Sequence, residues 1–340
     1  MGLAVEGDRH QVICLTPVKN EAWILDRFLQ CATVWADHII IADQQSTDGS
    51  REIASHYSKV RLIDNPTLEF NEPERQRLLI AAAREIPGSK VLIGLDADEI
   101  LTANVIYELE WQRVLRSQPG TLLTFQKVAL KPDLSSYWVE LDRDYFGFVD
   151  DGSPHMGKKI HSPRVPVPVE APTLHLKAIK ILHYQYTDWR RMESKQRWYQ
   201  CWERLHQTEL RPVQVYRQYH HMYHQMAKTS VMVPLEWLNG YQQRGIDMTR
   251  VFKDRQFWWD RAVVDLLAKY GASTFRRCDI WAIDWSQFFQ GTGMEVDVDR
   301  YRDPRSYLDR LFHDWLKLTQ PYHRWLLVRL VDRFLRLLGW

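Results

Sequence analysis

Short apolar runs alternate with amphipathic segments along the first half of the chain. Gln11–Thr16, His38–Ala42 and Val91–Leu95 are unbroken runs rich in branched aliphatic residues. Such runs are typical of strands that are buried on both faces of a parallel sheet. The segments between them, including Glu21–Val34 and Pro73–Glu85, have helical periodicity. This alternation with short loops predicts an α/β fold built from parallel β-α-β units, with helices flanking the sheet.

The pattern changes in the second half of the chain. Thr121–Leu130 and Ile179–His183 are predicted strands. Residues 131–172 between them are predicted to be irregular, because six of the fifteen prolines fall there. From Asp188 onward the periodicity is mainly helical. The sequence therefore predicts an α/β domain at 1–187 and a helical C-terminal region at 188–340.

Carboxylates follow directly after the most apolar of these runs. Val91–Leu95 leads into D-A-D-E, which places Asp96 and Asp98 on one short turn with Glu99 beside them. In open α/β sheets, ligands bind at the edge where parallel strands end. Two carboxylates on such a turn suit Mg²⁺ or Mn²⁺, which prefer oxygen ligands and often share them with phosphate. An isolated D-x-D would more often be a solvated turn, so the assignment depends on the other motifs.

Composition narrows the class of protein. The formal net charge of +2 argues against a protein built to grip nucleic acid, and no nucleic-acid partner is expected. Four scattered cysteines without C-x-x-C spacing fit buried thiols in a reducing compartment. We see no signal peptide and no apolar run long enough to span a membrane, so a cytoplasmic location is expected.

Several motifs occur in a characteristic order, each at a predicted strand end. They are T-P-V-K-N-E at Thr16–Glu21, Asp43, S-T-D-G-S at Ser46–Ser50, D-A-D-E at Asp96–Glu99, and L-H-Y at Leu182–Tyr184. In this order the chain resembles the family 2 glycosyltransferases, over roughly residues 10 to 190. The resemblance implies a GT-A fold, a nucleotide-sugar donor that is usually UDP-linked, a hydroxyl acceptor and inversion at the anomeric carbon. The acceptor would be a glycan, a lipid-linked glycan or a protein.

The resemblance also assigns the donor-binding residues. Pro17, Lys19 and Glu21 would line the base and ribose pocket, Asp43 would hydrogen-bond the base, and Asp48 would shape the pocket wall. A further arginine would face the diphosphate, and this role falls on Arg77. Its neighbour Arg75 points about 200° away around the same predicted helix, so only one of the two should face the site. Ordinary surface charge and helix capping are the structural alternatives for these residues.

The same resemblance implies a metal centre. Asp98 would bind the metal directly, Asp96 would contact ribose or the metal, and His183 would complete the shell, with His175 as its rival. A histidine ligand favours Mn²⁺ over Mg²⁺. Lys195 and Arg197 resemble a basic residue that follows this histidine in the family.

The catalytic base is less well defined by the motifs. In the resembling branch a glutamate stands where this chain has Ser162, and serine cannot act as the base unaided. Asp151, Asp150 and Glu170 are nearby in sequence, and Asp151 is favoured. The missing glutamate also supports an alternative, a catalytically inactive GT-A-like protein that binds nucleotide or scaffolds an assembly. A nucleotidyltransferase is disfavoured because residues 17–21 contain no glycine to cradle a triphosphate.

The last segment, Pro321–Leu338, predicts a strongly amphipathic helix. Arg329, Asp332, Arg333 and Arg336 fall in one arc, and leucine, valine and phenylalanine fill the rest. A basic stripe, a wide apolar face and flanking tryptophans resemble an interfacial helix on a membrane surface, here the inner face. The alternative is a helix docked on the protein itself or at a dimer interface.

Overall fold

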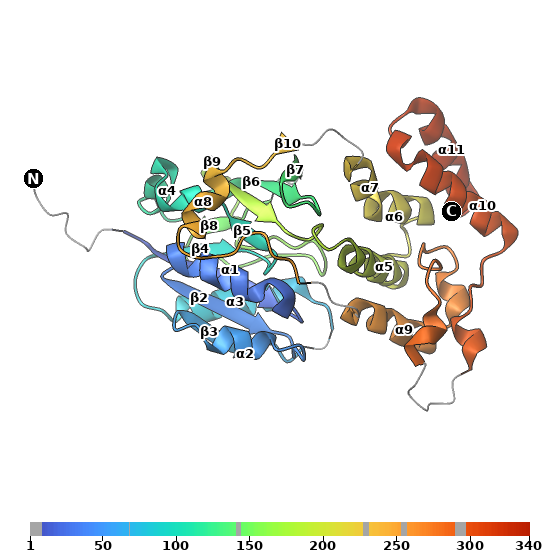
Figure 1. Cartoon of the computed structure of the whole chain (residues 1–340), viewed down its shortest axis with the longest axis horizontal. Coiled ribbons are helices and arrows are strands. Elements are labelled where there is room, and N and C mark those ends of the chain that lie inside the picture. Colours follow the sequence, from blue (N-terminus) through green and yellow to red (C-terminus); the bar gives the residue numbers. More distant parts are fainter. Residues whose placement is uncertain (1–8, 68, 141–143, 227–230, 253–256, 290–296) are drawn as a thin grey trace, which may run out of the picture. The chain divides into compact units, whose positions relative to one another are not determined.

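The computed structural model describes residues 9–67, 69–140, 144–226, 231–252, 257–289 and 297–340. The chain divides into two compact units (Figure 1). The first unit comprises residues 1–187 and 230–253, and the second comprises residues 188–229 and 254–340. The sequence prediction had placed residues 230–253 in the C-terminal region, whereas the contacts group them with the first unit.

Within the described residues, the first unit forms one ten-stranded sheet. In chain order, the strands are β1 Gln11–Val18, β2 His38–Asp43, β3 Val60–Asp64, β4 Lys90–Gly94, β5 Glu99–Leu101, β6 Leu122–Leu130, β7 Ser136–Val139, β8 Gly147–Val149, β9 Thr173–His183 and β10 Val231–Met232. The helices of this unit are α1 Ala22–Trp35, α2 Ser50–Ser55, α3 Glu72–Arg84, η1 Ala103–Ile106, α4 Leu109–Val114 and α8 Glu236–Gln242.

The strand directions place the ends of four strands at one edge of the sheet. Strands β3, β2, β1 and β4 lie side by side and run parallel. β8 is antiparallel to both β4 and β6, so β6 runs in the same direction as β4, and β9 runs parallel to β6. β1, β2, β4 and β9 therefore end at the same edge, which we call the carboxyl edge.

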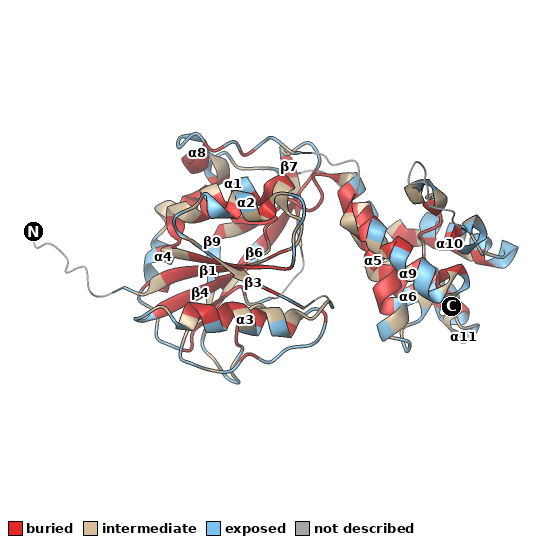
Figure 2. Ribbon diagram, turned by 90° about the horizontal axis from the view of Figure 1, so that it is seen from below, coloured by how far each residue is buried: buried red, intermediate tan, exposed pale blue. Residues whose placement is uncertain are grey.

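Alternating residues of the central strands enter two separate apolar cores. In β1, Val12 and Cys14 pack in the core that includes α1, whereas Ile13 and Leu15 pack in the core that includes α3. Figure 2 shows the strands as buried, with α1 and α3 on opposite faces of the sheet. This two-sided burial explains why β1 and β4 read as continuous apolar runs. The α/β fold class with a helical C-terminal region is confirmed.

One part of the sequence prediction was wrong in detail. The segment 131–172 was expected to be irregular but contributes β7 and β8 to the sheet. Both strands are only three or four residues long and depend on pairing with distant partners. The acidic turn enters the short strand β5, followed by η1 and the six-residue α4.

The second unit is helical within its described residues. Its elements are α5 Trp189–His206, α6 Pro212–Tyr219, α7 His221–Met226, α9 Trp258–Tyr270, η2 Ala272–Phe275, η3 Trp285–Phe289, η4 Val298–Tyr301, α10 Tyr307–Thr319, η5 Gln320–Tyr322 and α11 Leu326–Leu337. None of the described helices in either unit is long and apolar enough to cross a bilayer. All four cysteines are buried as free thiols, as the sequence indicated.

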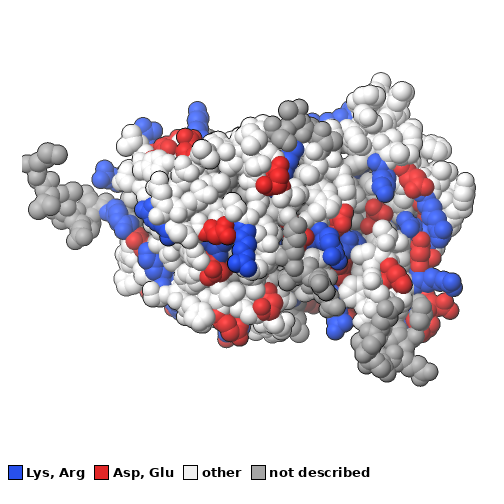
Figure 3. Space-filling model, in the orientation of Figure 1, with Lys and Arg blue, Asp and Glu red and all other residues white. Residues whose placement is uncertain are grey.

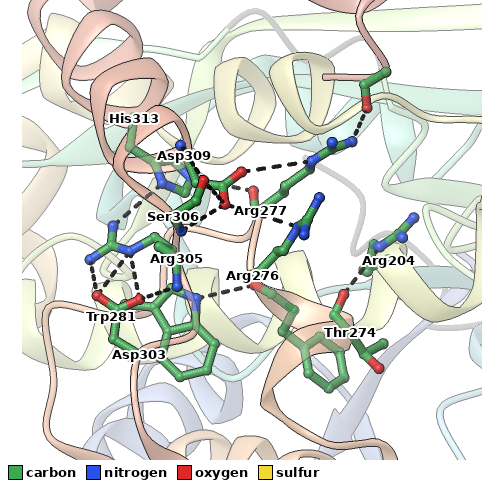
Figure 4. Close-up of polar contacts among 12 residues, drawn as sticks. Arg204, Thr274, Arg276, Arg277, Trp281, Asp303, Arg305, Ser306, Asp309 and His313 are labelled. Carbon is green, nitrogen blue, oxygen red and sulfur yellow. Dashed lines mark hydrogen bonds and ion pairs between the residues drawn. The ribbon is translucent and has the colours of Figure 1, made fainter.

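A polar cluster anchors the C-terminal helices in this unit (Figure 4). Ser306 and Asp309 form a capping box at the start of α10. Arg277 approaches the carboxylate of Asp309 at 3.9 Å and donates a hydrogen bond to the carbonyl oxygen of Gly339. The last residue, Trp340, is buried against the rings of Phe312 and His313. The end of α11 is therefore fixed to the rest of its unit.

Candidate active site

The acidic turn is closed by its own hydrogen bonds at the carboxyl edge. The backbone N–H of Asp96 donates to the carboxylate of Glu99 at 3.0 Å, and the N–H of Glu99 donates to the Asp96 carbonyl at 2.9 Å. β5 then pairs with β9 so that Glu99 lies opposite His183. This register brings Nε2 of His183 to 3.8 Å from Oδ2 of Asp98. Two residues 85 positions apart are thus brought together by strand pairing.

A continuous chain of alternating charges connects the two aspartates. Arg164 lies 3.2 Å from Asp96 and 2.6 Å from Glu99. Lys127 joins Glu99 to Glu140, at 3.4 Å and 3.0 Å. Glu140 in turn contacts Nδ1 of His183 at 3.0 Å, and His183 faces Asp98. Each of the buried charges in this chain is paired, which offsets the cost of removing it from water.

A glycine allows the arginine to reach the turn. A Cβ atom on Gly94, the last residue of β4, would lie 2.9 Å from Cβ of Arg164 and 3.3 Å from its carbonyl oxygen. Real side chains do not tolerate such approach, so only glycine fits. The glycine in V-L-I-G-L-D-A-D is explained by this contact. The adjacent carboxylates of Asp96 and Glu99 raise the pKa of Arg164 despite its burial, so the guanidinium stays charged.

Neighbouring charges stabilise the ionised forms of both Glu140 and His183. Burial by itself opposes the charged form of each residue, yet His183 and Lys127 hold the pKa of Glu140 well below its ordinary value. For His183, Glu140 and Asp98 outweigh burial and raise its pKa above the ordinary value. Because Nδ1 faces Glu140, Nε2 is the nitrogen that faces Asp98. A carboxylate on one ring nitrogen with the other turned to a site is a common arrangement of metal-binding histidines.

The donor set at this edge fits part of a metal shell. Two ligands about 2.1 Å from a shared Mg²⁺ or Mn²⁺ ion are separated by roughly 3 to 4 Å, and Asp98 Oδ2 and His183 Nε2 are 3.8 Å apart. Among the described residues, no three acidic, histidine or cysteine side chains converge as a complete site. Asp96 instead contacts Arg164. The remaining positions would have to come from phosphate oxygens and water, as is usual for these cations.

Asp43 ends β2 at the carboxyl edge with one oxygen unpaired. Its Oδ2 accepts hydrogen bonds from the backbone N–H of Ser46 at 3.2 Å and from Arg51 at 2.8 Å. Its Oδ1 is buried and has no hydrogen-bond partner in the described part of the chain. A buried acceptor without a partner costs about 1–3 kcal/mol, so a ligand that donates an N–H here would be favoured.

Asp48 holds the neighbouring loops together. Its Oδ2 accepts from the N–H of Ala22, the first residue of α1, at 2.9 Å. Its Oδ1 accepts from the hydroxyl of Ser50 at 2.6 Å, and that hydroxyl oxygen accepts from the N–H of Glu21 at 2.9 Å. Asp48 therefore caps α1 from another loop, and it also caps α2 locally by accepting from the backbone N–H of Ser50 at 3.1 Å. The contact with Ala22 fixes the position of the segment after β1.

Three other predicted donor residues lie at or just after the end of β1. Pro17, Lys19 and Glu21 are half-buried, and burial lowers the pKa of Lys19. Glu21 accepts a hydrogen bond from the indole of Trp23 at 2.7 Å.

The two candidate arginines of α3 differ in exposure. Arg77 is exposed, whereas Arg75 is half-buried, with its guanidinium over the ring of Phe70. This difference matches the expected divergence of the two side chains around the helix.

The three predicted catalytic bases are not brought to the carboxyl edge. β8 is antiparallel to β4 with Val149 opposite Val91, so Asp150 and Asp151 follow at the start of β4 rather than at its end. Asp150 is held there by Arg84 at 2.7 Å. Glu170 precedes β9, which begins opposite Leu122 at the start of β6. Strand direction therefore places all three near the opposite edge.

Two of the rival assignments have other partners. His175 is exposed and hydrogen-bonds Thr124 at 2.7 Å, eight residues before His183 on β9. Arg197 lies in the helical unit and forms an ion pair with Asp260 at 2.9 Å.

Sequence analysis missed Lys127, Glu140 and Arg164. Of these three residues, only Lys127 could have been noticed in the sequence, because it is a charged residue within an apolar strand pattern.

Comparisons with known proteins support the sheet assignment over part of the chain. The family model described as "Glycosyl transferase family 2" matches residues 13–110, which span β1 to the start of α4 and include the acidic turn. The match ends before Lys127, Glu140, Arg164 and His183. No curated protein matches the sequence.

Three solved structures show weak, partial similarity. The first, described as a mycobacterial protein, has 14% identity and a TM-score of 0.27, with 35% of this chain and 41% of that chain covered. The second is glucosyl-3-phosphoglycerate synthase from Mycobacterium tuberculosis with Mn²⁺, UDP and phosphoglyceric acid, at 18% identity, a TM-score of 0.25, and 36% and 43% coverage. The third, 4-diphosphocytidyl-2C-methyl-D-erythritol synthase, has 10% identity, a TM-score of 0.22, and 26% and 47% coverage. This chain spans less than half the length of each, so no property of these proteins is transferred to it.

Proposed function

We propose that the chain is an inverting glycosyltransferase that moves a sugar from a nucleotide-sugar donor, UDP-linked, to a hydroxyl acceptor. The observation that carries the proposal is the convergence of polar groups at the carboxyl edge. Asp43 with its unpaired oxygen ends β2, and the acidic turn follows β4, while β1 lies between these strands. Nucleotide ligands of open α/β sheets bind at this position. The family match over residues 13–110 covers these three strands.

Each residue of the edge has a proposed role. Asp43 Oδ1 accepts an N–H of the base, while Pro17, Lys19 and Glu21 line the nucleoside pocket that Asp48 braces. Asp98 and His183, with Asp96, hold a divalent metal, which is Mn²⁺ or Mg²⁺. When bound, that metal neutralises charge on the diphosphate leaving group. Arg77 adds positive charge on the same side, and Glu140 keeps Nε2 of His183 turned toward Asp98.

We propose Asp144 as the catalytic base, in place of Asp150, Asp151 and Glu170. Gly147 pairs with Ile93 near the end of β4, so Asp144 stands at the carboxyl edge just before β8. Its side chain is exposed, and its charge contributes to the raised pKa of Arg164. It would accept the proton of the acceptor hydroxyl during displacement.

The first test is thermal melting of the full chain with UDP, GDP, CMP or TDP, each with and without Mn²⁺. Ligand binding to the folded state raises the melting temperature by mass action. We expect a Mn²⁺-dependent rise with UDP, which is lost in Asp98→Asn and kept in the matched variant Asp151→Asn. No rise with any nucleotide in folded protein would contradict the donor site.

A second test separates a transferase from a nucleotide-binding scaffold. The displaced position of Asp150, Asp151 and Glu170 is the observation that favours the inactive alternative. The full chain is incubated with Mn²⁺ and UDP-sugars, and the release of UDP is followed. We expect Asp144→Asn to keep the melting shift but release UDP about 100-fold more slowly. Binding without release in the unmodified chain would favour the scaffold.

The acceptor and cellular site are further parts of the proposal. The hydroxyl is carried by a glycan, a lipid-linked glycan or a protein, and the enzyme works in the cytoplasm at the inner face of a membrane. The surface of the C-terminal helix supports this placement.

A further inference from the structure

Helix α11 buries only a narrow stripe of its surface and leaves most of its apolar side chains exposed. Its buried residues are Val328, Asp332 and Leu335, at positions i, i+4 and i+7. Asp332 forms an ion pair with Arg217 of α6 at 2.9 Å, and Leu335 packs in a cluster with Val213 and Trp340. The helix is therefore docked by a narrow stripe whose centre is a charge pair.

The outward surface of α11 is composed of large apolar side chains. The residues are Trp325, Leu326, Leu327, Leu330, Val331, Phe334, Leu337 and Leu338, and all are exposed. Leu327 and Leu337 are 75% and 80% exposed. In the view of Figure 3 the outer end of the helical unit at α11 is largely uncharged. Apolar patches of this size on soluble proteins usually mark a surface that something else covers.

A basic groove lies between α6 and α11 beside this apolar surface. It has a volume of about 770 Å³ and is lined by Arg211, Arg329, Arg333 and Arg336, with Leu330 and Leu337. Its single acidic lining residue is Asp332, which is already paired with Arg217. Among the described residues, no carboxylate forms an ion pair with Arg211, Arg329 or Arg333. The groove thus presents uncompensated positive charge next to leucine side chains.

We propose that this surface docks on a bilayer that contains anionic phospholipid, with the lipid phosphate in the arginine groove and the apolar face of α11 among the acyl chains. Arginines pair well with phosphate oxygens, and an interfacial helix combines basic residues with leucine, phenylalanine and tryptophan. Tyr322 and Trp325, with ring centroids 4.8 Å apart, stand at the start of the helix, where aromatic side chains suit the headgroup level.

The alternative occupant, a second copy of the chain, fits the charges less well. In a two-fold dimer the same patch meets itself, so the arginines of both copies would face one another across the interface. Like charges opposed in this way disfavour association. The fixed end of α11, where Arg277 contacts Gly339 and Trp340 is buried, also argues that the apolar face does not fold back onto its own unit.

The test is co-sedimentation of the full chain with phosphatidylcholine vesicles, with and without one-third phosphatidylglycerol. We expect binding to the anionic vesicles only. Arg329→Glu with Arg333→Glu should weaken it by at least about tenfold, since each basic residue near an anionic surface contributes about fivefold. Leu327→Ser with Phe334→Ser should also abolish sedimentation. The matched control, Arg113→Glu with Arg116→Glu, reverses two exposed arginines in the first unit and should bind as the unmodified chain does.

Three outcomes would overturn the proposal: equal binding to both kinds of vesicle, no loss in the Arg329/Arg333 variant, or a stable dimer in light scattering that does not bind vesicles. The inference does not depend on glycosyl transfer. A cooperative melting transition of the same variants without ligand shows whether they are folded, and the Mn²⁺-dependent shift with UDP tests the donor site separately.

Discussion

Two amphipathic helices of this chain bury opposite parts of their surfaces. α1 buries nine of its fourteen residues, including Phe28 and Leu29, against the sheet. α11 buries only three of twelve, and one of these is the charged Asp332. Their sequences have similar helical periodicity. The difference teaches that periodicity identifies two faces of a helix, but the surroundings decide which face is covered.

The largest expected effect contrasts phenylalanines in the two helices. Phe28 is 1% exposed, so Phe28→Ala should lower the free energy of unfolding by about 3–5 kcal/mol through lost burial and a residual cavity. Phe334 is 58% exposed, and Phe334→Ala should change it by about 0.5 kcal/mol or less. Urea unfolding of both variants measures the contrast. Equal losses would show that α11 is covered within the chain.

A second experiment tests the inward stripe of α11. Asp332→Ala leaves Arg217 buried without its carboxylate and should destabilise the protein by about 3 kcal/mol. Its matched control is Arg329→Ala, which removes an exposed residue one turn away and should be nearly neutral. A neutral Asp332→Ala in urea unfolding would mean that the stripe does not hold the helix.

The charge pair in the first unit should produce a distinct pH dependence. Glu140 has a lowered pKa, so its stabilisation is complete above the ordinary value of 4.5 and is lost as pH falls through the lowered one. His183 has a raised pKa, so its stabilisation is complete below 6.5 and is lost as pH rises through the raised one. The pair therefore contributes most between pH 4.5 and 6.5. Unfolding measured in EDTA from well below pH 4.5 to well above pH 6.5 should show a maximum of stability within that window, which Glu140→Gln flattens.

The central part of the fold could be predicted because its signals are local. β1, β2 and β4 are buried on both faces, so their apolar runs ended in recognisable polar turns, and Asp43, Asp96 and Asp98 were found at the correct edge. The scattered spacing of the four cysteines, without C-x-x-C, had also indicated buried thiols.

The rest of the site depends on pairings between distant segments. Glu140 and Arg164 come from a segment whose prolines suggested irregular structure. The register of β6, β7 and β9 brings Glu140 to His183, and Arg164 reaches the acidic turn by packing over Gly94. The positions of the predicted bases could not be read from the sequence for a similar reason. Asp150 and Asp151 are close to Ser162 in sequence, but the antiparallel direction of β8 carries them to the other edge.

Residues 230–253 belong to the first unit, and this limits where the chain can be cut to produce that unit alone. A protein truncated after Thr187 would lose Trp237, Tyr241 and Met248, which are buried in the apolar core beside α1. It would also lose the carbonyl groups of Asp247 and Arg250, to which Arg27 of α1 donates hydrogen bonds. A single proteolytic cut at residue 187 therefore cannot release an intact α/β unit. An expressed α/β unit therefore needs residues 230–253 as well as residues 1–187.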